Sequence, residues 1–250
     1  MGGFVAVDGV VGCDVLPVDD PAVTSGWSVF ETMLGEAGII GDLEGHLARL
    51  RRSAAAALVP WPSADLVPEL TAAAASGPLV RIRVTLTGGG RRVVQAEPAD
   101  VRRRFGTVRV ATGPAGDEPW LGRAVKHSSR APWRVAVLRS GVDDVVLVRS
   151  GRLLEATTAA VLAVVNGELW SAREGVLPSV TLDRWLGVAA TLGVAVHAEG
   201  ADIGSRFDGL YLVSATRELA PVVEIDGQTQ PGPEAVGRAL CAAAGHHPWP

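Results

Sequence analysis

The chain has 250 residues and a formal net charge of −4, and 48% of its residues are hydrophobic while 20% are charged. This length and apolar content suit one large or two small globular domains and exclude a disordered chain. The acidic balance argues against a nucleic-acid partner, and no apolar run is long enough to cross a membrane.

The two cysteines, Cys13 and Cys241, form neither a disulfide framework nor a metal-binding pattern. No Lys or Arg precedes the apolar residues of the N-terminal segment, which is not the pattern of a secretory signal. We therefore expect a cytoplasmic protein.

The first third of the sequence has the pattern of a mixed α/β unit. Asp8-Gly9 forms a tight turn between two Val-rich segments, and Asp42 is a plausible N-cap for a run of apolar residues at helical spacing. The pattern predicts strands over residues 4–7, 10–11, 80–86, 93–94 and 108–111 and helices over 43–58 and 66–75.

A Gly- and Pro-rich stretch over residues 113–122 is the best linker in the sequence, and we place the domain boundary there. It separates an N-terminal α/β lobe, residues 1–112, from a C-terminal lobe, residues 123–250. The second lobe has strand patterns over 145–148, 153–155, 160–165, 168–170, 194–197, 210–213 and 222–225, a helix around Trp185 and a closing helix over 233–244. The sequence therefore predicts an α+β chain in two lobes.

Lys126 is the single lysine among 23 basic residues. A genome that favours GC-rich codons replaces Lys by Arg wherever either residue serves, so a retained lysine suggests a special role. A Lys amine whose pKa is lowered can attack a carbonyl carbon, whereas a guanidinium cannot. The alternative is an ordinary surface lysine just past the linker.

Two charged residues could also take part in a site. Glu155 ends an apolar strand, where it could hold the protonated ring nitrogen of a pyridine cofactor or serve as a simple strand-end charge. Arg49 lies on a predicted helix, where its guanidinium could clamp a phosphate bidentately. His46 on the same helix is interpreted as a packed structural histidine.

Two polar segments offer further phosphate donors. Val180-Thr181 opens the predicted helix that carries Trp185, and the unpaired N–H groups of a helix N-terminus suit a phosphate. Ser214-Ala215-Thr216 follows a strand and offers two hydroxyls and backbone donors. An ordinary helix cap and an ordinary polar loop are the alternatives.

Taken together, six segments resemble the class IV, or fold type IV, pyridoxal-phosphate enzymes, and they occur in that family's order. The family includes branched-chain and D-amino acid aminotransferases and 4-amino-4-deoxychorismate lyase. The segments are Val29-Phe30-Glu31-Thr32 (F-E-T), His46-Leu47-Ala48-Arg49-Leu50 (H-x-x-R-L), Val125-Lys126 (the Schiff-base lysine), Glu155-Ala156-Thr157 (the pyridine-binding Glu), Leu177-Pro178-Ser179-Val180-Thr181 (the phosphate loop) and residues 214–222 (S-T-T-x-E-[IV]-x-P-V).

The resemblance implies an α+β, two-lobed fold type IV enzyme with a smaller N-terminal lobe, a larger C-terminal lobe and pyridoxal 5'-phosphate (PLP) between them. It also implies a homodimer. Lys126 would form the Schiff base and shuttle the substrate proton, and Glu155 would keep the pyridine nitrogen protonated. The remaining cofactor-binding residues would be Arg49, Val180, Thr181, Ser214, Ala215 and Thr216.

The chain departs from the family pattern in several places. Ala160 stands five residues after Glu155, where the family commonly has Asn. Ser179 replaces the Gly of the phosphate loop, and Leu182 replaces the Arg that usually follows the loop's Thr, with Arg184 two residues further on. Residues 25–28 replace the G-D-G that commonly precedes F-E-T.

Three functions fit these segments, and in each enzymatic case the partner is a small-molecule amino substrate. The first is 4-amino-4-deoxychorismate lyase, which releases pyruvate to give 4-aminobenzoate in folate biosynthesis. The short chain favours it, as does Lys126-His127 with Arg130, which looks like the lyase's K-H-x-x-R. Thr32 is then a candidate catalytic residue near the substrate.

The second function is an aminotransferase acting on D- or branched-chain amino acids, which residues 214–222 favour. The third is a non-catalytic relative, which the departures favour. Arg81, Arg83 and Arg130 are the candidates for binding a substrate carboxylate.

Overall fold

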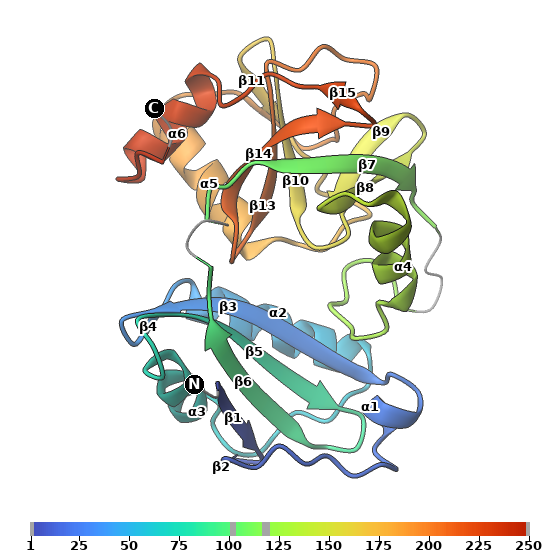
Figure 1. Ribbon diagram of the computed structural model, residues 1–250, viewed down its shortest axis with the longest axis vertical. Helices are drawn as coiled ribbons and strands as arrows, with labels where there is room; N and C mark the ends of the chain where they lie inside the picture. Colours follow the sequence, from blue (N-terminus) through green and yellow to red (C-terminus); the bar gives the residue numbers. More distant parts are fainter. Residues whose placement is uncertain (1–2, 101–103, 117–120, 249–250) are drawn as a thin grey trace. The chain divides into compact units, whose positions relative to one another are not determined.

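The computed structural model describes residues 3–100, 104–116 and 121–248. The chain divides into two compact units, and each unit is built from two separate stretches of chain (Figure 1). Met1–Val101 and Pro119–Arg130 belong to the first unit, and Arg102–Glu118 and Ala131–Pro250 belong to the second.

The first unit is a six-stranded antiparallel sheet with helices on one face. Its strand order is β2-β1-β6-β5-β3-β4. The strands are β1 (Phe4–Val7), β2 (Val10–Val11), β3 (Ser28–Glu36), β4 (Ile39–Ile40), β5 (Leu79–Thr87) and β6 (Arg92–Pro98), and the helices are α1 (Pro21–Thr24), α2 (Leu43–Ala56) and α3 (Val67–Ala74).

Alternation along the central strands decides which face of this sheet is covered. Met33 of β3 and Ile82 of β5 are opposite each other and fully buried, and they join one apolar cluster with Leu50 of α2 and Leu70 of α3. Burying these side chains removes them from water, which is the main term that holds α2 and α3 on the sheet. Residues one position along each strand point to the other face.

The second unit is built on a nine-stranded mixed sheet. The main path is β12-β11-β10-β13-β14-β7-β8-β9, and β15 pairs with β14. The strands are β7 (Val108–Pro114), β8 (Asp144–Arg149), β9 (Arg152–Ala156), β10 (Ala160–Val165), β11 (Glu168–Trp170), β12 (Val196–His197), β13 (Gly209–Ser214), β14 (Glu218–Ile225) and β15 (Gln228–Thr229).

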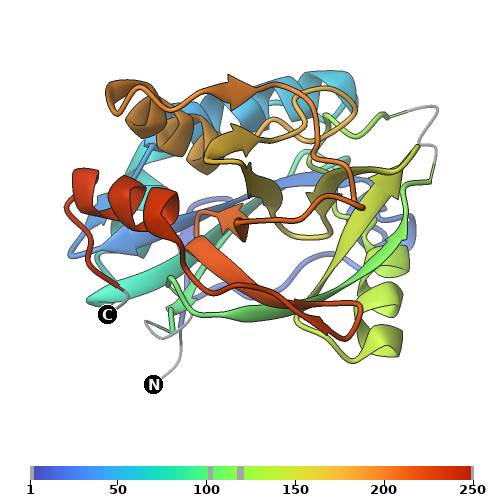
Figure 2. The same ribbon diagram turned by 90° about the horizontal axis from the view of Figure 1, so that it is seen from above.

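This sheet returns on itself, because β9 also pairs with β10 at Glu155 and Ala160. The helices of the unit are α4 (Ala131–Ser140), α5 (Val180–Thr191) and α6 (Ala235–Ala243). Trp185 of α5, Tyr211 of β13 and Leu240 of α6 are fully buried in one cluster. Figure 2 shows α6, in red, and α4, in yellow-green, at opposite ends of the unit.

Most of the predicted strands and helices are confirmed, but the domain boundary differs. β7 runs through Gly113 and Pro114, which pair with Leu147 and Val148 of β8, so the start of the predicted linker is sheet rather than connection. The residues that follow it return to the first unit, which places Lys126 there. Residues 117–120 of that linker lie outside the described part of the chain.

Two local predictions also need correction. The helix α4 has no predicted counterpart, because none of its residues is buried and its sequence has no apolar stripe. Asp42 stands at the N-cap position of α2 but has a φ of 53°, and its side chain makes no capping hydrogen bond. In the described residues, no helix has the length and apolar character needed to cross a bilayer.

The packing of α6 leads to a stability prediction. A Cβ atom on Gly237 would lie 2.0 Å from the hydroxyl of the buried Tyr211, so Gly237→Ala forces the two elements apart. We expect the free energy of unfolding to fall by about 1–3 kcal/mol in urea denaturation. Gly187→Ala in α5 is the control, because nothing lies within 4 Å and we expect a gain of about 0.4–1 kcal/mol. Equal stability of the two variants would contradict this packing.

Candidate active site

The β3 strand presents the F-E-T residues to two different faces of the first unit's sheet. Glu31 faces α2 and is fully buried. Thr32 lies opposite Arg83 of β5, and Phe30 lies opposite Thr85. Because paired residues of an antiparallel sheet share a face, these four side chains project away from α2.

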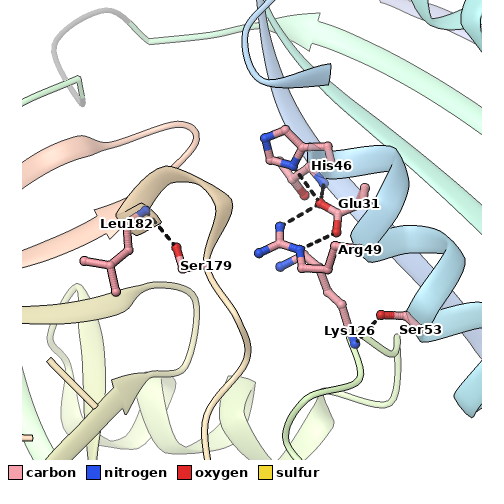
Figure 3. Close-up of polar contacts among 8 residues, drawn as sticks. Glu31, His46, Arg49, Ser53, Lys126, Ser179 and Leu182 are labelled. Atoms are coloured by element: carbon pink, nitrogen blue, oxygen red, sulfur yellow. Dashed lines mark hydrogen bonds and ion pairs between the residues drawn. The ribbon is translucent and has the colours of Figure 1, made fainter. Parts of the chain in front are cut away.

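A buried ion-pair cluster joins β3 to α2 (Figure 3). Arg49 donates Nε to Glu31 Oε1 at 2.6 Å and Nη2 to Glu31 Oε2 at 2.8 Å, and His46 Nδ1 lies 3.0 Å from Oε2. All three residues are at most 6% exposed. Burial opposes ionisation of Glu31, but the Arg49 and His46 contacts outweigh it and lower its pKa to about 2.

This cluster changes how Arg49 is understood. The sequence predicts a phosphate clamp at Arg49, whereas the guanidinium forms a bidentate pair with Glu31. The pair holds Arg49 in one orientation and keeps its positive charge in the interior. A role at a phosphate stays a prediction. His46 is buried as expected, and it adds the second contact to Glu31.

The segment that carries Lys126 pairs with the start of β3 through an isolated antiparallel bridge. Phe30 N donates to Lys126 O at 3.0 Å, Ser128 N donates to Ser28 O at 2.9 Å, and Val29 forms an antiparallel bridge with His127. From α2, Ser53 Oγ accepts the Lys126 N–H at 3.1 Å (Figure 3). Backbone pairing on one side and a helix side chain on the other therefore fix the position of Lys126.

The amine of Lys126 is tuned toward the neutral form. Burial lowers its pKa to about 7, with the charges of Arg49, Arg130 and Arg83 acting in the same direction and Glu31 acting against them. Burial and neighbouring cations both disfavour the ammonium form. A large fraction of the amine is thus unprotonated near neutral pH, as a carbonyl-attacking lysine requires.

Three cations surround the ring of Phe30 on the face opposite α2. The distances from the ring centroid are 3.7 Å to Arg83 Cζ, 4.9 Å to Lys126 Nζ and 5.8 Å to Arg130 Cζ. Phe30 itself is 5% exposed. A ring face attracts cations, but it does not neutralise their charge.

Arg83 and Arg81 differ in how their charges are satisfied. Arg81 Nη2 lies 2.5 Å from Glu97 Oε1 in an exposed ion pair. Arg83 has no carboxylate partner among the described residues. Its hydrogen bonds go to the hydroxyls of Thr85 at 3.3 Å and Ser128 at 3.4 Å. Partial burial, with Arg81 nearby, lowers the pKa of Arg83 to about 10. A half-buried cation without a carboxylate partner is suited to an anionic ligand.

In the second unit, Glu155 sits where β9 meets β10. Its residue is 6% exposed, and its Oε2 accepts the Leu177 N–H at 3.1 Å. Glu155 pairs with Ala160, and Ala160 pairs with Val213 of β13. Glu155 therefore lies beside the phosphate-loop segment. Across the sheet, one residue of β10 separates it from Val213, which directly precedes Ser214.

The phosphate-loop segment forms the N-terminus of α5. Ser179 is the N-cap, and its Oγ accepts the Leu182 N–H at 3.2 Å, as Figure 3 shows. The backbone of Ser179 has a φ of −98°, which any residue adopts, so the missing Gly causes no strain there. Val180 and Thr181 occupy the first two helical positions, whose N–H groups point out of a helix N-terminus.

The departure at Leu182 and Arg184 has a structural explanation within this unit. Leu182, in place of the usual Arg, is buried in the apolar cluster with Trp185. Arg184 instead donates to Glu218, which Arg104 approaches to 3.7 Å. Glu218 has a φ of 58°, a conformation that is rare for a residue with a side chain and is here held by two cations.

The predicted site residues thus gather in two sets. Arg49, Thr32 and Lys126 belong to the first unit, with Arg49 and Thr32 on opposite faces of its sheet, and the second unit carries Glu155, Val180, Thr181, Ser214, Ala215 and Thr216. Sequence reasoning missed Ser53, Phe30 and Ser128 as neighbours of the lysine segment. For Phe30 the sequence offers one signal, which is its position next to Glu31 in the F-E-T segment.

Comparisons with known proteins bear on the family and the fold. Among solved structures, the fold IV-transaminase CpuTA1 from Curtobacterium pusillum is 26% identical, with a TM-score of 0.84 over 97% of this chain and 98% of that chain. A PLP-bound hypothetical aminotransferase from Mycobacterium tuberculosis is 25% identical, with a TM-score of 0.84 over 96% and 98%. The branched-chain aminotransferase of Escherichia coli, 18% identical with a TM-score of 0.83 over 96% and 92%, shares the fold.

A search of the curated proteins found no match. The family model described as amino-transferase class IV matches residues 28–225.

Proposed function

Because the chain belongs to the class IV aminotransferase family, whose members are PLP-dependent enzymes of fold type IV, we propose that it is a 4-amino-4-deoxychorismate lyase. The observation that carries the proposal is the pair of guanidinium groups, Arg83 and Arg130, that lie near the Phe30 ring beside the Lys126 amine. The substrate of such a lyase carries two carboxylates, so it needs more positive charge than a monocarboxylate does. The Lys126-His127-x-x-Arg130 spacing supports the same substrate.

The residues present fit PLP. An aldehyde requires a neutral amine, and Lys126 has a pKa of about 7. A protonated pyridine nitrogen requires a carboxylate, and Glu155 is buried beside the phosphate-loop segment. A phosphate requires N–H and hydroxyl donors, which α5 offers at Val180 and Thr181.

We assign the residues of each unit a separate role in the reaction. Bound PLP supplies an electron sink for the carbon that bears the substrate amine. With PLP bound, Lys126 would supply the neutral amine that the cofactor aldehyde requires, and it would serve as the base that takes the proton from that carbon. Thr32 and Arg83 lie opposite each other on β3 and β5, where Arg83 binds a substrate carboxylate.

The second unit carries the residues that we propose for the pyridine nitrogen and the phosphate of the cofactor. Glu155 would keep the pyridine nitrogen protonated, and Val180, Thr181, Ser214, Ala215 and Thr216 would bind the phosphate. The reaction divides the substrate into pyruvate and 4-aminobenzoate, and formation of the aromatic ring makes it favourable. No 2-oxo acid is consumed.

That stoichiometry gives the test. We expect purified protein loaded with PLP to release pyruvate from aminodeoxychorismate with no 2-oxo acid added, measured with a coupled lactate dehydrogenase assay. Strict dependence on an added 2-oxo acid would contradict the lyase. A colourless protein that takes up no PLP would instead support a non-catalytic relative.

The second candidate is an aminotransferase for D- or branched-chain amino acids. The segment over residues 214–222 favours it, as does the 26% identity to a transaminase. Ping-pong kinetics with an amino acid and a 2-oxo acid would identify this activity. The homodimer that the resemblance implies can be tested on the same sample by light scattering.

The role of Arg83 leads to a kinetic prediction. We expect Arg83→Gln to raise KM by about 10- to 100-fold, because a charged hydrogen bond to substrate contributes about 1.5–3 kcal/mol. The pKa of Lys126 should also rise, since Arg83 is one of the charges that lower it, so the acidic limb of the pH profile moves to higher pH. Arg81→Gln is the control, because Arg81 is paired with Glu97. Equal KM values for the two variants would contradict a carboxylate site at Arg83.

A further inference from the structure

Asp144, the first residue of β8, is a buried carboxylate that accepts four hydrogen bonds. It is fully buried. Its Oδ1 accepts from Thr157 Oγ1 at 2.5 Å and from Val145 N at 2.9 Å. Its Oδ2 accepts from Thr158 Oγ1 and from Arg217 Nη1, the latter at 3.0 Å. Both oxygens are thus fully used by protein donors.

The side-chain donors come from two different turns. Thr157 and Thr158 follow β9 and lead into β10, so they come two and three residues after Glu155. Arg217 ends the turn between β13 and β14, directly after Ser214-Ala215-Thr216. Each turn carries residues that the proposed function assigns to the cofactor, while Asp144 lies on neither turn.

Backbone hydrogen bonds also hold each turn: Ala156 N donates to Ala159 O at 2.8 Å in the first, and Phe105 N donates to Arg217 O at 2.9 Å at the end of the second. The backbone of the first is attached to β8 by Thr157 N, which donates to Val145 O at 2.9 Å. The second is closed by Arg217 N, which donates to Ser214 O at 3.2 Å and Ser214 Oγ at 3.3 Å. The Asp144 carboxylate is the shared partner that connects one turn to the other.

Burial of Asp144 makes the loss of any of its hydrogen bonds costly, so the two turns are held firmly to it. A carboxylate without contact to water must keep its donors, because losing one leaves a buried charge unsatisfied. Arg217, whose side chain is 17% exposed, likewise depends on Asp144 for its counter-charge. The hydroxyls of Thr157 and Thr158 are oriented toward the same oxygens.

We propose that Asp144 is a positioning residue that sets the geometry of both cofactor-binding turns. Through Thr157 and Thr158 it fixes the end of β9 and so the direction of Glu155. Through Arg217 it fixes the turn over residues 214–216. The inference rests on the proposed use of PLP by this site, but it requires neither the lyase nor the aminotransferase activity.

Four variants of the full chain separate the two connections. Asp144→Asn removes both, Thr157→Val removes the hydroxyl of the first turn at constant shape, and Arg217→Gln removes the charge of the second. Asp143→Asn is the matched control, because Asp143 is exposed and its carboxylate accepts the Arg109 N–H at 2.8 Å rather than a donor from either turn.

The first readout is hydrogen exchange in the protein without cofactor. We expect Asp144→Asn to speed exchange about tenfold or more at amides 155–160 and 214–217. Thr157→Val should affect only the first set, Arg217→Gln only the second, and Asp143→Asn neither. Uniform acceleration across the second unit in all variants would indicate a merely structural role and overturn the proposal.

The second readout is the bound cofactor. We expect Arg217→Gln to weaken PLP affinity about tenfold or more, and Thr157→Val to shift the pH dependence of the cofactor's absorbance instead. If Asp144→Asn fails to fold, these two variants still decide the question. Unchanged affinity and spectra in both would overturn the inference, whereas a wild-type protein that binds no PLP would overturn the proposed function and leave the exchange result standing.

Discussion

Replacing Lys126 with Arg is expected to reduce turnover by at least about 10³-fold while leaving the fold intact. An Arg side chain can keep the local positive charge, but its guanidinium stays protonated and cannot attack an aldehyde. Because Ser53 and β3 hold this segment through the Lys126 backbone, the substitution keeps those hydrogen bonds. Circular dichroism and the melting temperature check the fold, and either product assay checks turnover.

The chain's composition makes the chemical test unusually clean. Borohydride reduction of the PLP-loaded protein should add one cofactor mass to the peptide that carries Lys126, the single lysine of the sequence. Arg139→Lys places a second, exposed lysine in α4 and serves as control, since its amine should remain unmodified. Activity retained in Lys126→Arg, or equal labelling of both lysines, would refute the assignment.

The lowered pKa of Lys126 adds a pH signature. Its pKa falls from 10.5 to about 7, so the reactive neutral amine predominates above that pH and declines below it. The rate at which the cofactor-free protein takes up PLP should therefore rise through about pH 7 and level off. Stopped-flow absorbance measures this rate, and an inflection near the ordinary value of 10.5 would contradict a buried, tuned amine.

Replacing Glu31 with Gln is expected to cost about 3–5 kcal/mol of folding free energy at pH 7. The substitution leaves the buried Arg49 without its bidentate partner and weakens the His46 contact. Glu97→Gln is the control, because it breaks the exposed pair with Arg81, and exposed pairs contribute about 0–1 kcal/mol. Urea denaturation of the cofactor-free protein compares the two variants.

The pH dependence of this effect has a definite sign. The folded-state pKa of Glu31 is about 2, below its ordinary value of 4.5, so its stabilising contribution is complete above pH 4.5 and disappears as pH falls toward 2. The difference in unfolding free energy between wild type and Glu31→Gln should narrow over that interval. A difference that stays constant with pH, or one no larger than that of Glu97→Gln, would show that the pair contributes little.

Much of the candidate site was accessible from sequence because its parts are local. The H-x-x-R-L helix, the lysine segment and the strand that carries Glu155 can each be recognised from a short stretch of sequence. The partnership of Arg49 with Glu31 was not accessible, although both residues stood in recognised segments. They are eighteen positions apart, and they meet only because α2 packs on β3.

The features that sequence missed depend on long-range assembly. Asp143-Asp144 has the pattern of a polar loop, and nothing local tells that the second carboxylate is fully buried while the first is exposed. The domain boundary failed for a related reason. Gly and Pro mark a likely break in regular structure, but Gly113 and Pro114 extend β7 because β8 lies alongside.

Each unit is built from two separate stretches of chain, and this affects both folding during synthesis and the choice of fragments for expression. A fragment that stops near residue 100 lacks the Lys126 segment that pairs with β3, so it leaves the β3 backbone unpaired there and lacks the proposed nucleophile. Such a fragment is a poor choice for expression in isolation. During synthesis, the first unit cannot complete itself until Arg130 has emerged. By then β7 has already been made, yet its partner β14 lies more than a hundred residues further along the chain. A slow late step in folding, awaiting that strand, is the kinetic consequence.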